Sequence, residues 1–305
     1  MRVVAEGLKF PEGPVALKSG RILVCEMQGQ TLAEIEPTSG TVFRTVHCGG
    51  GPNGAAMGPD GALYVCNNGG SLWRDVRGLA VMGLPPANYE GGFIQRVELG
   101  EERVYTLYTH CDGERLRGPN DIVFDAAGGF WFTDMGKNWK RTHDHGGVYY
   151  ARADGSSIQE VLFPLLTPNG IALSPDGKEL YVAETLSGRI WAWPVVSPGK
   201  LGKGGNGPRG GRLVYGFGGY QLLDSMAVDA EGNICAATLL TAAISVVRPD
   251  GQLLDQVLVP GDEPFITNIC FGGNDLRTAY ITGSGRGRLY ATEWRCPGLR
   301  LAFEL

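Results

Sequence analysis

The sequence lacks the long apolar segments of membrane and secreted proteins. No apolar run approaches the roughly 18 residues of a membrane span, and the first residues contain no apolar stretch as long as that of a secretory signal. The seven cysteines are scattered and include no Cys-x-x-Cys pair, so neither a zinc knuckle nor a disulfide framework is indicated. We therefore expect a cytoplasmic protein with reduced cysteines and no membrane partner.

Strong charge of one sign is also missing. The formal net charge is −5, and no run of Lys and Arg is longer than a pair. Because binding to nucleic-acid phosphates needs clustered basic residues, we expect no nucleic-acid partner and a small molecule instead. The motifs His-x-x-x-His and Gly-x-Ser-x-Gly do not occur, so zinc-protease and serine-hydrolase mechanisms have no motif support.

Turn-forming residues are abundant, with 48 glycines and 18 prolines among 305 residues, which indicates many short strands. One phrase recurs: a small polar opening, alternating apolar residues, a turn that usually contains Gly, and a second apolar run. In the copy that starts at Pro168, the apolar alternation lies on both sides of a turn at residues 175–177, as in a β-hairpin. The six copies begin at Pro11, Pro52, Pro119, Pro168, Asp224 and Thr267.

The spacing of these copies predicts the fold. Successive copies are 41 to 67 residues apart, and further strand pairs lie between them, which makes about four strands per unit. Six such units are typical of an all-β, six-bladed β-propeller, which we expect to span residues 1–305 as one domain. A solenoid of strands is disfavoured because the unit lengths vary and no strict short period is present.

An oxygen-bearing side chain marks the same position in each copy. The innermost strand of a propeller blade faces the central channel, so these side chains should converge on one axis. Carboxylates and amides without a thiol suit a hard divalent cation; Ca²⁺ is the expected ion, and Zn²⁺, Mn²⁺ or Mg²⁺ also suits an open site. Asn-Gly and Asn-Asp also form ordinary turns, which is the alternative for Asn53 and Asn268. The six positions are Glu12, Asn53, Asn120, Asn169, Asp224 and Asn268.

Other polar residues are weaker candidates. Arg117 precedes Asn120 by three residues and either binds a substrate hydroxyl or carboxylate or lies at the surface. His143 lies in an irregular segment, residues 139–146, which we hypothesise to be a lid; it is either an exposed loop residue or a substrate contact. Four residues lie fourteen positions after the first four markers and are predicted to be solvated strand ends rather than direct ligands: Glu26, Asn67, Asp134 and Ala183.

Five phrases in order give the chain a resemblance to a known family. From about Leu8 to Trp294 it resembles the SMP-30/gluconolactonase family of regucalcin-like lactonases. Each phrase alone is moderately specific, and five in the same order are strong. The phrases are FPEGPVA, RGPNDIVFDAAGGFWFTD, TPNGIALSPDGKELYVAE, DSMAVDAEGNICAA and TNICFGGNDLRTAYIT.

The resemblance implies a metal-dependent lactonase that hydrolyses a sugar lactone or a related small lactone, and we expect a monomer or homodimer. It implies that Glu12, Asn169 and Asp224 hold the metal, and that Asn120 faces metal and substrate. The metal would polarise the carbonyl, while Asp224 or a metal-bound hydroxide activates water. Some sugar-lactone members carry an arginine two residues before the Asn120 position; this chain has Gly118 there, which puts aldonolactone specificity in doubt.

Two other readings remain open at this point. One is a related propeller enzyme, resembling strictosidine-synthase-like or paraoxonase-like proteins, that performs condensation or hydrolyses aryl esters or organophosphates; substrate profiling separates it, since fold does not dictate chemistry. The other is a non-enzymatic calcium-binding propeller, for which the protein would saturate the metal site.

Overall fold

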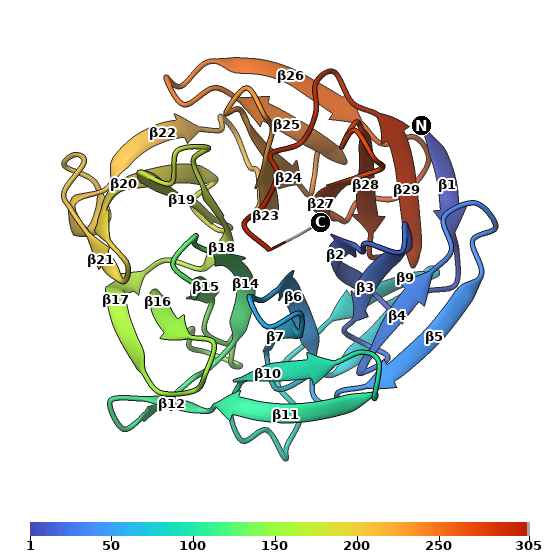
Figure 1. The fold of residues 1–305 in the computed structure, drawn as a ribbon, viewed down its shortest axis with the longest axis horizontal. Coiled ribbons are helices and arrows are strands. Elements are labelled where there is room, and N and C mark those ends of the chain that lie inside the picture. Colours follow the sequence, from blue (N-terminus) through green and yellow to red (C-terminus); the bar gives the residue numbers. More distant parts are fainter. Residues whose placement is uncertain (304–305) are drawn as a thin grey trace.

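The computed structural model describes residues 1–303 and shows six antiparallel sheets arranged in a ring, five with four strands and one with five (Figure 1). The predicted all-β, six-bladed β-propeller is confirmed. The described residues contain no α-helix, only a 3-10 turn at Pro208–Gly210 in the glycine-rich loop of the fourth blade. None of their helices could span a membrane.

The strands of each blade follow one another from the channel outward. The first three are β2 (Pro11–Ala16), β3 (Ile22–Glu26), β4 (Thr31–Ile35) and β5 (Val42–His47); β6 (Pro52–Met57), β7 (Leu63–Asn67), β10 (Phe93–Glu98) and β11 (Arg103–Tyr108); and β14 (Pro119–Phe124), β15 (Gly129–Asp134), β16 (Gly146–Arg152) and β17 (Ile158–Leu165). The next two are β18 (Pro168–Leu173), β19 (Glu179–Glu184), β20 (Arg189–Ser197) and β22 (Arg212–Gly216); and β23 (Leu223–Val228), β24 (Ile234–Thr238), β25 (Ala243–Val247) and β26 (Leu253–Leu258).

The sixth blade joins the two ends of the chain. It consists of β27 (Ile266–Gly272), β28 (Thr278–Gly283), β29 (Arg288–Glu293) and, outermost, the N-terminal strand β1 (Arg2–Ala5). The register pairs Arg2 with Ala291 and Val3 with Tyr290. Three short elements lie outside the blades: the hairpins β8 (Trp73–Val76)–β9 (Leu79–Met82) and β12 (His110–Cys111)–β13 (Glu114–Arg115), and the strand β21 (Lys200–Leu201) beside β20.

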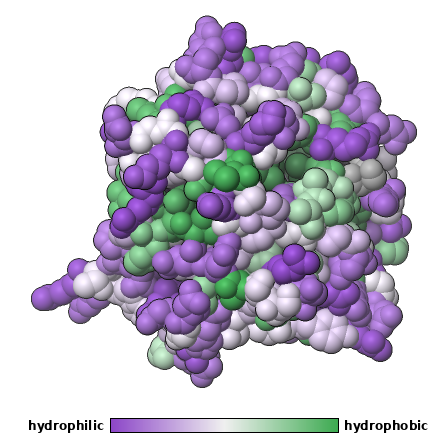
Figure 2. All heavy atoms as spheres, turned by 60° about the vertical axis from the view of Figure 1, so that its left-hand side comes forward, coloured by the Kyte–Doolittle hydropathy of each residue, from purple (hydrophilic) through white to green (hydrophobic). Residues whose placement is uncertain are grey.

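Hydrophobic contact between neighbouring blades holds the ring together. Six clusters of buried apolar side chains are present, and each lies between one pair of adjacent blades. Between the third and fourth blades, for example, the fully buried Trp131 and Trp193 pack in the same cluster. The outer surface is mainly hydrophilic on the side seen in Figure 2, with a hydrophobic patch near its middle.

A one-residue bulge interrupts every innermost strand near its start. In β18, Pro168 pairs with Glu184 and Ile171 pairs with Val182, so two residues of β18 face one residue of β19. The same shift occurs in β2, β6, β14, β23 and β27. A bulge places two successive residues on the same stretch of the partner strand and redirects the first side chain. We call the end of the ring where the innermost strands begin the upper face, and the other end the lower face.

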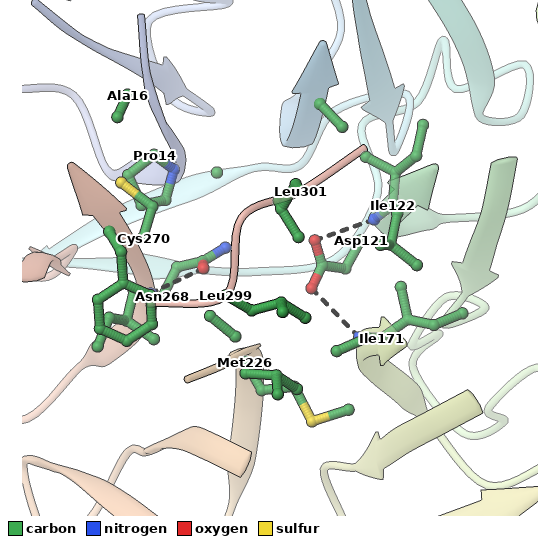
Figure 3. A pocket seen from close by; sticks show the side chains of 18 of the residues that line it. Pro14, Ala16, Asp121, Ile122, Ile171, Met226, Asn268, Cys270, Leu299 and Leu301 are labelled. Carbon is green, nitrogen blue, oxygen red and sulfur yellow. Dashed lines mark hydrogen bonds between the residues drawn. The ribbon is translucent and has the colours of Figure 1, made fainter. Parts of the chain in front are cut away.

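The C-terminal segment crosses the lower face (Figure 1). Ala230 N donates to Pro297 O (2.8 Å) and Leu299 N donates to Val228 O (3.0 Å), which ties the segment to the fifth blade. Its Phe303 ring lies 5.7 Å from that of Phe124 in the third blade. Residues 299–301 therefore cover a cavity of about 80 Å³ in the lower half of the channel, whose wall is mostly apolar (Figure 3).

Because the innermost strands approach one another closely, one added methyl group should markedly lower the free energy of unfolding. A Cβ at Gly54 would lie 2.5 Å from the Asn120 carbonyl oxygen and 2.6 Å from the Asp121 Cα, both backbone atoms that cannot turn away. We expect Gly54→Ala to lower the free energy of unfolding by about 1–3 kcal/mol, as overpacking does. Gly100→Ala is the matched control, because a Cβ there meets nothing within 4 Å. Equal denaturation midpoints for the two variants would contradict the prediction.

Candidate functional site

Six polar side chains surround the upper end of the channel, one from the start of each innermost strand. Five are the residues predicted from the repeats, Glu12, Asn53, Asn120, Asn169 and Asp224. The sixth differs from the prediction. In β27, Ile266 pairs with Gly283 and Ile269 with Ile281. The strand register therefore makes Thr267, not Asn268, the residue equivalent to the other five. Asn268 corresponds to Gly170 and lines the lower cavity instead.

Two of the predicted metal ligands lie close to each other. The Asn169 amide lowers the pKa of the neighbouring Asp224 carboxyl, and its Nδ2 donates to Thr185 Oγ1 (3.1 Å). Asn169 Oδ1 accepts only a long hydrogen bond from Ser225 Oγ (3.5 Å). The amide is thus fixed with its carbonyl oxygen weakly engaged. On the other side of the ring, the neighbouring Thr267 hydroxyl lowers the pKa of Glu12.

The two carboxyl groups of the ring disfavour each other's charge. Burial raises the pKa of Glu12 well above its usual value, and the negative charge of Asp224 raises it further. Burial also raises the pKa of Asp224 to about 7, with a further contribution from Asp121. A divalent cation between such carboxylates would remove both penalties, since an opposite charge favours the ionised form.

Asn120 supplies an acceptor without a protein partner. Its Oδ1 is buried and makes no hydrogen bond, while its Nδ2 reaches only the Met135 sulfur at 3.7 Å. A buried polar atom without a partner is rare and indicates a ligand, an ion or water. Within residues 1–303 no three His, Cys, Asp or Glu side chains form a metal-binding group. An ion here would therefore depend on amide oxygens as well as on the two carboxylates, and this donor set fits a hard cation.

Asp121 is a channel residue that we did not predict from the sequence. It follows Asn120 in the bulge of β14 and accepts hydrogen bonds from Ile122 N (2.9 Å) and Ile171 N (3.3 Å) (Figure 3). Burial raises its pKa to about 7 despite these hydrogen bonds. The signal in the sequence was the Asn-Asp pair in a series where other copies have Asn-Gly.

The residues predicted as solvated strand ends have a structural role. Glu26 accepts from Lys9 N (2.8 Å), Asn67 from Gly51 N (2.8 Å), and Asp134 from the backbone of the loop that leads into β14. In the fourth blade Glu184, not Ala183, pairs with Pro168 and accepts from Leu166 N (3.0 Å). Each side chain thus holds the loop that enters an innermost strand, and three of the four are buried rather than solvated.

The other predicted contacts, Arg117 and His143, are not among the ring of six. Arg117 is exposed and lines a surface depression with Tyr89 and Trp139. His143 is half-buried, both of its ring nitrogens lack a hydrogen-bond partner, and its backbone forms a β-bridge with Asn138. This bridge folds residues 138–143 into a tight turn beside Tyr89, whose ring is 5.8 Å from that of Trp139.

Comparison with known proteins assigns the fold and the family. The family model described as "SMP-30/Gluconolactonase/LRE-like region" matches residues 10–285. Lactonase drp35 of Staphylococcus saprophyticus is 28% identical over 86% of this chain and 73% of its own length. A gluconolactonase of Zymomonas mobilis is 26% identical over 93% of this chain and 79% of its own length.

Solved structures agree on the fold. A gluconolactonase from Xanthomonas campestris superposes with a TM-score of 0.74 at 23% identity, over 95% of this chain and 88% of that one. A protein described as the calcium-binding protein regucalcin from Agrobacterium tumefaciens has a TM-score of 0.74 at 20% identity, over 98% of this chain and 97% of that one.

The raised pKa values predict how pH acts on the metal-stripped protein. Glu12, Asp121 and Asp224 hold protons in the folded state that an unfolded carboxyl, with a pKa near 3.8 to 4.5, has already lost. Their contribution to stability is therefore complete below about pH 4 and is lost as the pH rises through their folded-state pKa values, which are about 7 for Asp121 and Asp224. In EDTA we expect the Tm to fall from pH 5 to pH 8, and Ca²⁺ to raise it more at pH 8 than at pH 5.

The variant Asp224→Asn isolates the contribution of this carboxyl group. It should flatten the fall in Tm because one of the three groups no longer titrates, whereas Asp255→Asn, at an exposed position on β26, should leave the slope unchanged. A slope that is the same in Asp224→Asn and in the unmodified protein, measured by thermal unfolding across this pH range, would refute the assignment.

Proposed function

We propose that this chain, which belongs to the SMP-30/gluconolactonase/LRE-like family, is a metal-dependent hydrolase that opens the ring of a small lactone. The observation that carries the proposal is the pair of mutually destabilised carboxyl groups, Glu12 and Asp224, set among amide side chains at one end of the channel. The names of the relatives, lactonase and gluconolactonase, support the same reaction.

Glu12, Asn169 and Asp224 would hold the cation, and Ca²⁺ fits their oxygen donors best. Regucalcin, the neighbour described as calcium-binding, supports this choice. When bound, the ion supplies Lewis acidity that polarises the ester carbonyl and stabilises developing negative charge. Three protein ligands leave positions free for substrate and water, as a catalytic site requires.

The side chains of the ring perform the remaining steps. Asp224 accepts a proton from the attacking water. This role suits a carboxyl group that water can reach, because Asp224 is only half-buried whereas Glu12 is buried. The water oxygen bonds to the carbonyl carbon, the ring C–O bond breaks, and the leaving alkoxide takes up the proton that Asp224 accepted, which gives the hydroxy acid. Asn120, whose Oδ1 is buried without a partner, orients the substrate through its amide.

The two ends of the channel differ in a way that supports approach of the lactone from the upper face. On the lower face, residues 299–301 cover the channel. The cavity that they close is lined mainly by apolar side chains such as Ile122, Ile171 and Met226. The ring of six polar residues lies at the opposite end. A polar ester and its water would therefore meet Asp224 from above.

The proposal predicts a specific loss of activity. We expect metal-stripped protein that has been reloaded with Ca²⁺ to hydrolyse glucono-δ-lactone or a simple aliphatic lactone. The reaction is measured by pH-stat titration of the acid released. Asp224→Asn should lower kcat by on the order of 10²–10⁴-fold, the usual range for removal of a general base. Asp255→Asn, an exposed aspartate on β26, is the matched control and should retain full activity.

Two other outcomes would replace the proposal. If no lactone is hydrolysed while Ca²⁺ still raises the Tm, the ring is the ion site of a binding protein. If aryl esters or phosphotriesters are hydrolysed and lactones are not, the same fold performs different chemistry. Reloading with Zn²⁺, Mn²⁺ or Mg²⁺ in parallel identifies the cation that supports turnover.

A further inference from the structure

Lys137 is a buried cation with only neutral hydrogen-bond partners. Its side chain is 7% exposed, and its Nζ donates to Asn68 Oδ1 (3.2 Å) and Gly70 O (3.0 Å). The face of the Tyr89 ring lies 5.2 Å away. An ammonium group has three N–H donors, so one remains for another acceptor. Among residues 1–303 no carboxylate forms a salt bridge with it.

The loops around Lys137 place it beside the upper end of the channel. Lys137 lies two residues after Met135, whose sulfur contacts the Asn120 amide at 3.7 Å. Its partner Asn68 donates from its backbone N to Gly51 O (2.9 Å), directly before the strand that carries Asn53. Lys137 therefore bridges the two loops that adjoin Asn53 and Asn120, two of the six ring residues.

The backbone leaves no room for a side chain on the neighbouring loop. A Cβ at Gly118 would lie 2.5 Å from Gly136 O, and Met135 N donates to Gly118 O (2.9 Å). The 135–137 loop thus occupies the place where a side chain at position 118 would begin. Arg117 is exposed and lines the outer depression. The basic side chain beside Asn120 is therefore that of Lys137, which follows Gly136.

Keeping this charge is costly. Burial lowers the pKa of Lys137 to about 8, and Asp134 and Asp144 offset the effect only in part. A neutral amide donor could tie the same two loops without that desolvation cost. A buried charge next to a polar ring is the pattern of a group that acts on a ligand.

We propose that Lys137 is a substrate-positioning residue that donates its remaining N–H to an oxygen substituent on the lactone, so that the enzyme prefers hydroxylated lactones over unsubstituted ones. This inference rests on the proposed lactonase function. The ammonium group takes no part in bond making or breaking. It holds the hydroxylated side of the lactone against the loops of the second and third blades, while the ester group of the lactone faces Asp224.

The test compares two lactones in the Ca²⁺-loaded protein, glucono-δ-lactone and δ-valerolactone, which lacks hydroxyl groups. Lys137→Met should raise KM for glucono-δ-lactone by about 10–100-fold, the equivalent of losing one charge-assisted hydrogen bond, with little change for δ-valerolactone. Lys137→Gln keeps a neutral donor for the loops and should show the same selective loss. Lys140→Met, at an exposed lysine of the same loop, is the matched control.

Equal losses on both lactones, accompanied by a lower Tm, would show that Lys137 only ties the loops, and unchanged KM values would also overturn the proposal. If the unmodified protein hydrolyses neither lactone, the lactonase function fails separately. Calorimetric titration with sodium gluconate then decides the role of Lys137. Binding that is weakened in Lys137→Gln and retained in Lys140→Met would support it, whereas no binding, or equal binding by all three proteins, would reject it.

Discussion

The bulge at the start of each innermost strand is the constraint on which the rest of the channel depends. Without the extra residue, successive side chains would alternate strictly between the two faces of a sheet. With the extra residue, the first bulge residues of the six blades together surround the upper end of the channel, and the second bulge residues face one another across the axis. In the first and fourth blades the second position must be glycine, because a Cβ at Gly13 or Gly170 would approach the backbone of the next blade to 2.2 or 2.8 Å.

Asp121 shows how this crowded second position can hold a charge. Its carboxyl accepts hydrogen bonds from Ile122 N on the third blade and Ile171 N on the fourth, and Ser225 and Met226 on the fifth blade also lower its pKa. Gly54 in the second blade makes room for it, since a Cβ there would lie 2.8 Å from Asp121 Oδ1. The side chain therefore links the innermost strands around the axis, between the polar ring above and the apolar cavity below.

The sequence predicted what repeats and turn chemistry can specify. Recurrent hairpins with turns such as Pro175-Asp176-Gly177 gave the six blades, and the repeated oxygen-bearing position gave five of the six ring residues. Asn268 was misplaced by one residue because the position of a bulge depends on pairing with β28, which the local sequence does not display. Ala183 was misplaced by one residue in the same way, as the pairing of Pro168 with Glu184 shows.

Long-range contacts account for what the sequence did not predict. The exposed position of Arg117 depends on the loops around Tyr89 and Trp139, which are distant in the chain. Lys137 gave no signal because a lysine in a polar loop is normally exposed. It becomes significant only when its Nζ is found bonded to Asn68 and Gly70, almost seventy residues earlier in the sequence.

The distribution of hydrogen-bond donors decides which of the three channel carboxyls would hold a cation. Asp121 already accepts hydrogen bonds from two backbone groups, Ile122 N (2.9 Å) and Ile171 N (3.3 Å). Glu12 accepts a long one from Gly13 N (3.3 Å), while Asn169 and Ser225 are the neighbours that lower the pKa of Asp224. Because an ionised carboxylate offers about four acceptor sites, Glu12 and Asp224 retain sites for a cation. Two such carboxylates match the charge of one divalent ion, and the neutral amide of Asn169 completes the set without adding charge.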